Sequence, residues 1–126
     1  MAELIAMTAF MARGYTVMEP ISAETWDFAA THKESHEHIR AQVKTITKRV
    51  RDGVDYYVCK GRRNTGAPYS LAECDVFVGV YEGAVYLLDN RELSEYWVRV
   101  DEADSKWKRM DVVYDEVHVT ERMEEL

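Results

Sequence analysis

The sequence predicts an α+β (α/β) fold in which helices flank a central β-sheet, and three observations predict it. Residues 2–13 contain no glycine or proline and carry apolar residues at helical spacing. Apolar and polar residues then alternate with a period of two in several short segments. Two apolar runs, 75–81 and 84–88, are joined at a Glu-Gly pair, which is typical of a hairpin with buried strands.

Length and composition predict a single domain over residues 1–126, with a core over 2–90. The chain has 126 residues, 47% of them hydrophobic and 31% charged, which excludes disorder for most of it. We expect residues 91–126 to form an extension that packs on the core or at an oligomer interface. A helix that crosses a bilayer needs about 20 apolar residues, and no apolar run in the sequence is nearly that long. We therefore expect a cytoplasmic protein without a membrane partner.

The first elements are a helix and two strands. Gly14 ends the helix over 2–13. Residues 15–18 read as a short strand that stops before Pro20. Residues 26–31 alternate as a second strand that contains Asp27.

The next segment, residues 38–47, reads as one long strand. Its alternation places Ile39, Ala41 and Val43 on one face, and Gln42 and Lys44 together on the other. Residues 55–60 form a further strand before the glycine-flanked basic loop 61–66.

Three further elements complete the prediction. We expect a short helical turn over 68–71 and a helix over 91–97 with Asn90 as its cap. Residues 112–119 are apolar enough to pack, but the pattern does not decide between helix and strand. Cys59 and Cys74 lie in apolar strand contexts, and we expect reduced core thiols rather than a disulfide.

Charge is unevenly distributed along the chain. The net charge is -7, which alone disfavours a nucleic-acid partner, yet residues 40–63 hold eight basic and two acidic residues. This segment predicts a localised site for a polyanion, or with equal weight an ordinary solvated hairpin. The candidate DNA-binding residues are Lys48, Arg49, Arg51, Lys60, Arg62 and Arg63.

Chemistry is expected where the second and third predicted strands meet. If these strands pair antiparallel, Asp27 comes close to Gln42 and Lys44, and Glu3 near the start of the first helix supplies a further carboxylate. Oxygen ligands of this kind suit Mg²⁺, for which Mn²⁺ substitutes. We expect the metal ligands to be Asp27, Gln42, the Val43 carbonyl and Glu3, while Lys44 stabilises charge on a scissile phosphate.

These residues resemble those of a known nuclease superfamily. The quoted segments are the helix with Glu3, then Arg13-Gly14-Tyr15-Thr16-Val17, Pro20, Trp26-Asp27-Phe28, Ala41-Gln42-Val43-Lys44-Thr45, Pro68-Tyr69-Ser70, Cys74-Asp75-Val76-Phe77 and Tyr86-Leu87-Leu88. Together they resemble the PD-(D/E)XK nucleases, with most similarity to small intron-associated homing endonucleases and archaeal-type Holliday junction resolvases.

The resemblance implies a restriction-endonuclease-like αβββαβ core with a mixed central sheet. It also implies catalytic roles for Asp27, Gln42, Lys44 and Glu3 in a Mg²⁺-dependent endodeoxyribonuclease that leaves a 5′-phosphate and a 3′-hydroxyl. The implied partners are linear or branched double-stranded DNA and further copies of the chain, as a dimer or tetramer. The implied setting is the cytoplasm of a bacterial, archaeal or phage-infected cell.

Several alternatives stay open at this point. Gln42 brings no negative charge, so the chain is alternatively a catalytically inactive DNA-binding or interaction module on the same fold. An acidic adaptor that never touches DNA is a third reading. His32, His36 and His38 suggest zinc only weakly, because no fourth ligand is evident.

Overall fold

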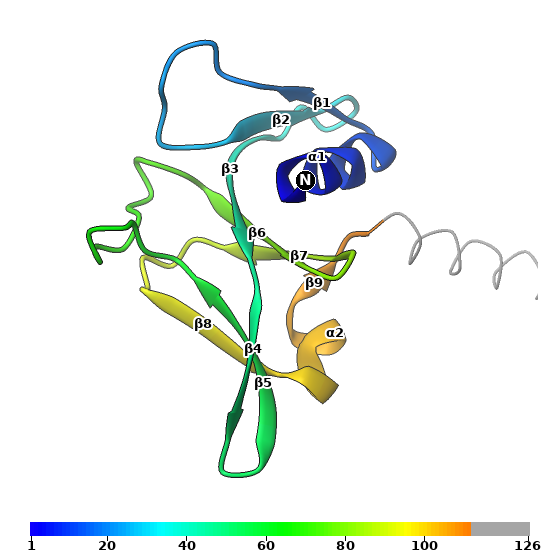
Figure 1. Ribbon diagram of the computed structural model, residues 1–126. Coiled ribbons are helices and arrows are strands. Elements are labelled where there is room, and N and C mark those ends of the chain that lie inside the picture. The colour runs from blue at the N-terminus through cyan, green and yellow to red at the C-terminus, as the bar shows by residue number, and fades with distance from the viewer. Residues whose placement is uncertain (112–126) are drawn as a thin grey trace, which may run out of the picture.

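The computed structural model describes residues 1–111 as a mixed α+β fold. The chain starts with helix α1 (Ala2–Ala12), and strands follow it for most of the described length (Figure 1). In chain order the elements after α1 are β1 (Tyr15–Met18), β2 (Phe28–His32), β3 (His38–Thr45), β4 (Thr47–Arg51), β5 (Val54–Lys60), β6 (Val76–Tyr81), β7 (Ala84–Asp89), β8 (Glu95–Arg99), the 3-10 turn η1 (Val100–Glu102), α2 (Ala103–Lys106) and β9 (Lys108–Arg109).

Six of the described strands form one mixed sheet in the order β1-β2-β3-β6-β7-β9. Neighbours in this sheet are antiparallel except β3 and β6, which run parallel. A parallel pair needs a crossover connection, and here the crossover contains the β4–β5 hairpin and a long loop rather than a helix. The fold class predicted from the sequence is therefore confirmed, with this difference in the crossover.

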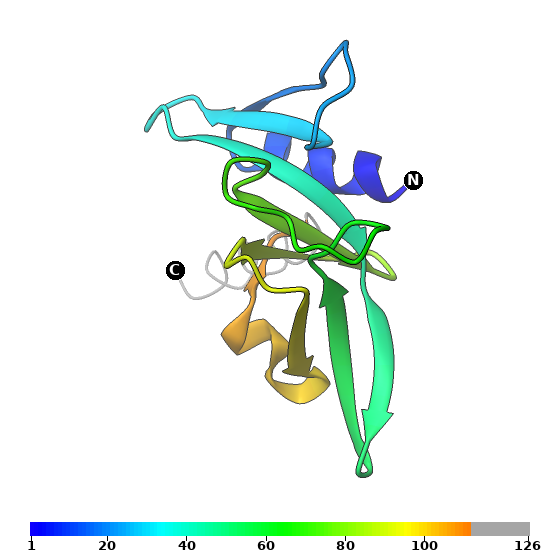
Figure 2. The same cartoon turned by 90° about the vertical axis from the view of Figure 1, so that its left-hand side faces the viewer.

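The crossover hairpin belongs to a second sheet of β4, β5 and β8 among the described residues. The chain passes from the first sheet to the second at Ile46, whose N–H donates to the Val80 carbonyl at 2.9 Å. Ile46 is 2% exposed, and its side chain occupies the space above Gly79. The predicted strand 38–47 is therefore divided in two, and the β4–β5 hairpin projects from the body of the molecule (Figures 1 and 2).

The first sheet has a hydrophobic cluster on each face. On one face, Phe10 of α1 packs with Phe28, Ala41 and Val78. On the opposite face, residues such as Phe77 pack with side chains of β5 and β8. Successive side chains of β3 therefore point alternately toward one cluster and toward the other.

Several local predictions are confirmed by the structure. α1 occupies the predicted helix, Gly14 follows it with φ +88°, and the β6–β7 hairpin turns at the predicted pair Glu82 and Gly83. Cys59 and Cys74 are buried and free. Burial raises the pKa of the Cys59 thiol to about 12 and that of Cys74 to about 11, as expected for inert core thiols.

The predicted helix over 91–97 is wrong, because residues 95–97 belong to strand β8. Tyr96 and Val98 are buried on either side of Trp97, and β8 pairs antiparallel with β5. Asn90 caps no helix. Its amide Nδ2 donates to the Cys74 carbonyl at 2.9 Å, and its Oδ1 accepts from the Glu92 N–H at 2.9 Å, which is a local side-chain turn.

Two smaller predictions also need correction. The helical turn expected to open over 68–71 begins later than Pro68, which forms an isolated bridge with Arg62. The turn lies at 71–73, where the Ser70 carbonyl accepts from the Cys74 N–H at 3.3 Å. β2 begins at Phe28, two residues later than the predicted strand 26–31. Residues 112–119 lie outside the described part of the chain.

Asp75 anchors β3 to the crossover loop through Arg40. Its Oδ2 accepts from the Arg40 backbone N–H at 2.8 Å and from Nε at 3.1 Å, while Oδ1 accepts from Nη2 at 3.0 Å. The hydrogen bonds from the Arg40 side chain are the main cause that lowers the pKa of Asp75. The carboxylate therefore stabilises the fold above its ordinary pKa of about 3.9, and this contribution is lost as pH falls through the lowered value.

We accordingly predict that Asp75→Asn flattens the acid limb of the stability curve. Urea unfolding measured from pH 6 down to pH 2 is expected to lose stability less steeply in this variant than in wild type. Asp52→Asn, at the exposed β4–β5 turn, is the matched control and is expected to follow wild type. Parallel pH curves for wild type and Asp75→Asn would contradict the assignment.

Among residues 1–111, neither α1 nor α2 has the length and apolar character of a membrane-spanning helix.

Candidate active site

Asp27 lies where β2 begins beside β3. Its backbone N–H donates to the Ala41 carbonyl at 2.8 Å, and its Oδ2 accepts from the Val43 N–H at 2.7 Å. The side chain thus takes the place that another β2 residue would occupy in the ladder, which explains why β2 starts only at Phe28. This hydrogen bond confirms the prediction that Asp27 lies next to the segment Gln42–Lys44.

Val43 presents backbone groups to the same edge of β3. In a strand, the N–H and the C=O of one residue point to the same side, so the Val43 carbonyl faces the region of Asp27. The Val43 side chain packs against the α1 cluster. The backbone of Val43 thus faces Asp27, while its side chain belongs to the core.

Gln42 and Lys44 share the face opposite α1. The register pairs Gln42 with Phe77 and Lys44 with Gly79, and laterally paired residues lie on the same face. Because Phe77 belongs to the second cluster, both side chains lie on that side of the sheet. The structure therefore confirms that Gln42 and Lys44 share a face.

Lys44 is held by the crossover loop. Its Nζ donates to the Arg62 carbonyl at 3.3 Å and lies 4.9 Å from the ring centroid of Tyr69. Burial lowers the pKa of Lys44, and the charge of Asp27 acts in the opposite direction. Burial is the main cause that raises the pKa of Tyr69, and the negative charge of Asp27 acts in the same direction.

Glu3 stands apart from these residues. It is exposed in the first turn of α1, and α1 packs on the sheet face that carries Ala41 and Val43. Gln42 and Lys44 lie on the other face. Within the described residues no hydrogen bond or ion pair joins Glu3 to the site, and its role as a ligand stays a prediction.

The donor chemistry of the site is compatible with a hard cation. The Asp27 carboxylate, the Gln42 amide and the Val43 carbonyl are oxygen donors, and Mg²⁺ commonly takes one or two protein carboxylates and keeps several waters. Residues 1–111 hold no group of three or more His, Cys, Asp or Glu side chains that would cage an ion. The same finding gives the zinc reading of His32, His36 and His38 no support.

The basic candidates divide over the two faces of the second sheet. The register pairs Arg49 with Tyr56 and Val58 with Trp97, so these residues share one face. Arg51 and Lys60 lie on the same face by alternation, while Lys48 lies on the other and pairs with Asp55 at 3.6 Å. Arg62 and Arg63 belong to the crossover loop, where they pair with Glu95 and Glu73 respectively.

An aromatic platform on this face was not predicted. The guanidinium carbons of Arg51 and Arg49 lie 4.3 and 5.7 Å from the Trp97 ring centroid, and Tyr56 packs edge-on against the same ring at 5.6 Å. Arg99, paired with Tyr56, extends the basic face. The alternation of Tyr96 and Val98 with Trp97 and Arg99 was the available signal, and the helix prediction concealed it.

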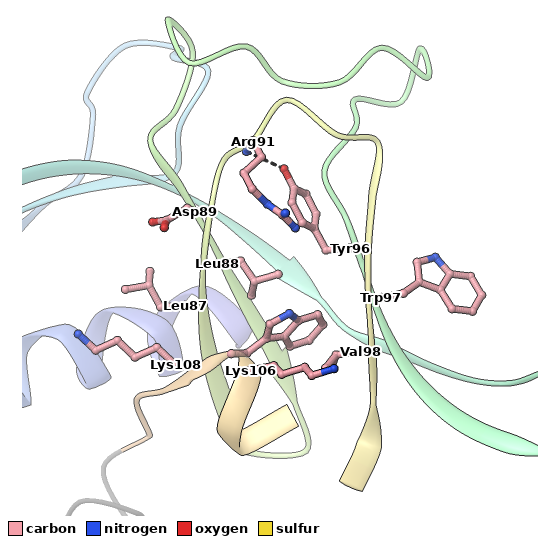
Figure 3. A pocket seen from close by; sticks show the side chains of 10 residues that line it. Leu87, Leu88, Asp89, Arg91, Tyr96, Trp97, Val98, Lys106 and Lys108 are labelled. Atoms are coloured by element: carbon pink, nitrogen blue, oxygen red, sulfur yellow. Dashed lines mark hydrogen bonds between the residues drawn. The ribbon is translucent and has the colours of Figure 1, made fainter. Parts of the chain in front are cut away.

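A separate cleft of about 450 Å³ lies between β7, β8 and the α2–β9 segment (Figure 3). Arg91 and Lys106 line it together with the aromatic ring of Trp107, and Asp89 is its one carboxylate among the described residues. None of the residues predicted to form the active site lines this cleft. The sequence reasoning did not foresee it.

Comparison with known proteins supports the fold and no more. No protein-family model matches the sequence, and no curated protein matches it. Among solved structures, the chain is similar to a bacterial homing endonuclease, I-Ssp6803I, with a TM-score of 0.57 and 22% sequence identity. The match covers 77% of this chain and 69% of the endonuclease chain. The chain therefore has a fold similar to that of this endonuclease, and membership of the PD-(D/E)XK superfamily stays a prediction.

Proposed function

We propose that the protein is a metal-dependent DNA endonuclease that hydrolyses phosphodiester bonds. The observation that carries the proposal is the junction of β2 and β3, where the Asp27 carboxylate accepts from the Val43 N–H and the half-buried Lys44 is the next residue of the same strand. A carboxylate and an ammonium at the same end of β3, next to a basic loop, suit the hydrolysis of an anionic ester. The fold shared with a homing endonuclease adds support.

Each residue has a distinct part in the proposed chemistry. Asp27, the Gln42 side chain and the Val43 carbonyl would hold Mg²⁺ or Mn²⁺. When bound, such an ion acts as a Lewis acid toward the phosphate and lowers the pKa of a bound water. Lys44 orients the phosphate and stabilises the negative charge that develops on it. Arg62 holds Lys44 through its carbonyl oxygen.

The proposed DNA surface continues from the site over the outer face of β4, β5 and β8. The aromatic platform orders Arg49 and Arg51 before DNA arrives, which reduces the entropy cost of phosphate contacts. Lys60 extends this face toward the crossover loop that carries Arg62 and Arg63. The acidic remainder of the surface would confine the DNA to this side.

We predict that the double variant Arg49→Ala/Arg51→Ala weakens duplex binding roughly 10- to 100-fold at 0.1 M salt. The slope of log K against log salt is expected to fall by about two, since two phosphate contacts are lost. Fluorescence anisotropy with a labelled duplex measures both quantities. Lys33→Ala, in the exposed turn before β3, is the control and should retain the wild-type slope.

Lys48 provides a finer comparison within the same strand. Because Lys48 lies on the opposite face and pairs with Asp55, we expect Lys48→Ala to change the slope less than either arginine substitution does. Equal losses at Lys48, Arg49 and Arg51 would contradict binding through one face of the sheet.

The test of the proposed function must not assume a target sequence. Duplexes with randomised inserts of about 20 base pairs are incubated with the protein in Mg²⁺ or Mn²⁺, and newly formed 5′-phosphate ends are captured and sequenced. We expect cut ends to accumulate at a defined position. Ends no more frequent than those of a Lys44→Ala sample would overturn the proposal.

A second candidate, a DNA-binding module without activity, is favoured by one specific observation. The junction offers one carboxylate, Asp27, beside the neutral Gln42, and no three-residue acidic group occurs in residues 1–111. Salt-sensitive duplex binding without cut ends would select this candidate.

We further propose that the chain assembles as a homodimer or homotetramer in the cytoplasm, because cutting two strands favours two symmetry-related sites.

A further inference from the structure

Two cations from different parts of the chain meet on the ring of Tyr69. The Lys44 Nζ lies 4.9 Å from the ring centroid, and the guanidinium carbon of Arg63 lies 5.4 Å from it. The ring itself packs edge-on against Phe77 at 6.0 Å, which fixes its place over the sheet. Arg63 is therefore a loop residue placed beside the candidate active site.

Arg63 is already paired with a carboxylate of its own loop, Glu73. The Glu73 Oε1 also accepts from the Ser70 N–H at 2.9 Å and from the Ser70 hydroxyl at 3.1 Å. The Glu73 carbonyl accepts from the Thr25 hydroxyl at 2.8 Å, which ties this part of the loop to the segment just before Asp27. Glu73 thus has anchors that do not depend on Arg63.

We propose that, in the free protein, the Glu73 carboxylate occupies the place of a DNA phosphate on Arg63. When the duplex binds, the phosphate displaces Glu73 from Arg63. The inference rests on the proposed function and deepens it by assigning Arg63 as a second phosphate-binding cation beside Lys44. A guanidinium matches carboxylate and phosphate oxygens with the same paired donors, so one anion replaces the other without a new geometry. Glu73 keeps its bonds to Ser70 after the exchange.

The exposure of the pair suits an exchange. The Arg63 side chain is 40% exposed, so incoming phosphate reaches the arginine from solvent, whereas the Glu73 side chain is only 19% exposed. In the absence of DNA, Glu73 neutralises Arg63 and opposes the approach of any polyanion. It therefore lowers the affinity for DNA that does not place a phosphate at the site.

The decisive variant is Glu73→Gln, because glutamine keeps the oxygen that accepts from Ser70 and removes only the charge. We expect it to bind a labelled duplex about fivefold more tightly at 0.1 M salt in Ca²⁺, with a log–log salt slope steeper by about one. Glu34→Gln, in the exposed turn before β3, is the matched control for net charge and is expected to bind like wild type.

The Arg63→Ala background makes the test specific. If Glu73 acts through Arg63, then Arg63→Ala alone weakens binding, and Glu73→Gln added to it gives no gain. The inference is overturned if Glu73→Gln binds like Glu34→Gln, or if its gain persists in the Arg63→Ala background. Wild type that shows no salt-sensitive duplex binding would overturn the proposed function as well, so the two failures are distinguishable.

Discussion

Lys44→Ala is expected to abolish DNA cutting while leaving DNA binding nearly intact. The Lys44 ammonium donates to the Arg62 carbonyl and lies against Tyr69, so it is held by the crossover loop rather than on the outer basic face. Removing a positioned charge of this kind costs about 100- to 1,000-fold in the rate of the chemical step. We expect single-turnover cleavage to fall by that factor, and duplex affinity in Ca²⁺ to change by less than about threefold.

Stability separates this effect from misfolding. Burial lowers the pKa of Lys44 in the folded chain, so folding works against its protonation. At neutral pH the charged form destabilises the fold, and this penalty declines as pH rises through the lowered pKa. Lys44→Met should therefore unfold at a higher temperature than wild type at pH 7, with a smaller gap at higher pH, and should still fail to cut.

Two results would contradict the role of Lys44. Cutting by Lys44→Ala at the wild-type rate would remove the residue from the chemistry. A loss of binding equal to the loss of cutting would make Lys44 a general DNA contact. Lys33→Ala, whose side chain is exposed in the turn before β3, is the control for loss of one positive charge.

The arrangement of Asp27 and Lys44 was predictable because it depends on local periodicity. Strand alternation alone places Gln42 and Lys44 on one face, and the antiparallel neighbour then brings Asp27 to the same end of β3. The antiparallel pairing expected for these strands is confirmed, even though β2 begins later than expected. A slip of the register by one residue would turn buried side chains to the other face of the sheet. The register is therefore strongly specified where the paired side chains are buried, as at Phe28 and Ala41.

The remainder depended on contacts that are distant in sequence. β8 is a strand because it pairs with β5 and because Tyr96 and Val98 pack into the second cluster. The sequence of residues 91–99 does not show which strand it pairs with. The same holds for Tyr69, whose closeness to Lys44 requires the crossover loop to return to β3. In the sequence, Tyr69 belongs only to a segment that carries the family resemblance, and no pattern placed it at the site.

The other large effect is expected at Asp27, where two substitutions separate a structural role from a metal-binding role. The Asp27 Oδ2 accepts from the Val43 N–H, so the residue completes the end of the β2–β3 ladder. Asp27→Asn keeps an oxygen that accepts this hydrogen bond and removes the negative charge. Asp27→Ala removes both.

We expect both variants to lose cutting by about 1,000-fold, because the charge that would hold a divalent ion is gone in each. Only Asp27→Ala should lose stability, by about 1–3 kcal/mol, since it leaves the Val43 N–H without its acceptor. Titration with Mn²⁺ followed by calorimetry measures the metal, and urea unfolding measures the fold. Asp52→Asn, an exposed turn residue, controls for the loss of one carboxylate.

The comparison decides what the acidic position is for. If Asp27→Asn binds Mn²⁺ and cuts like wild type, the carboxylate serves only the ladder, and the metal site proposed at this junction is wrong. If Asp27→Asn folds normally but neither binds Mn²⁺ nor cuts, the same side chain both completes the sheet and holds the ion. That double role would explain how the site binds a metal although Gln42 is neutral. The Val43 N–H positions the Asp27 carboxylate, the one negative charge on which metal binding depends.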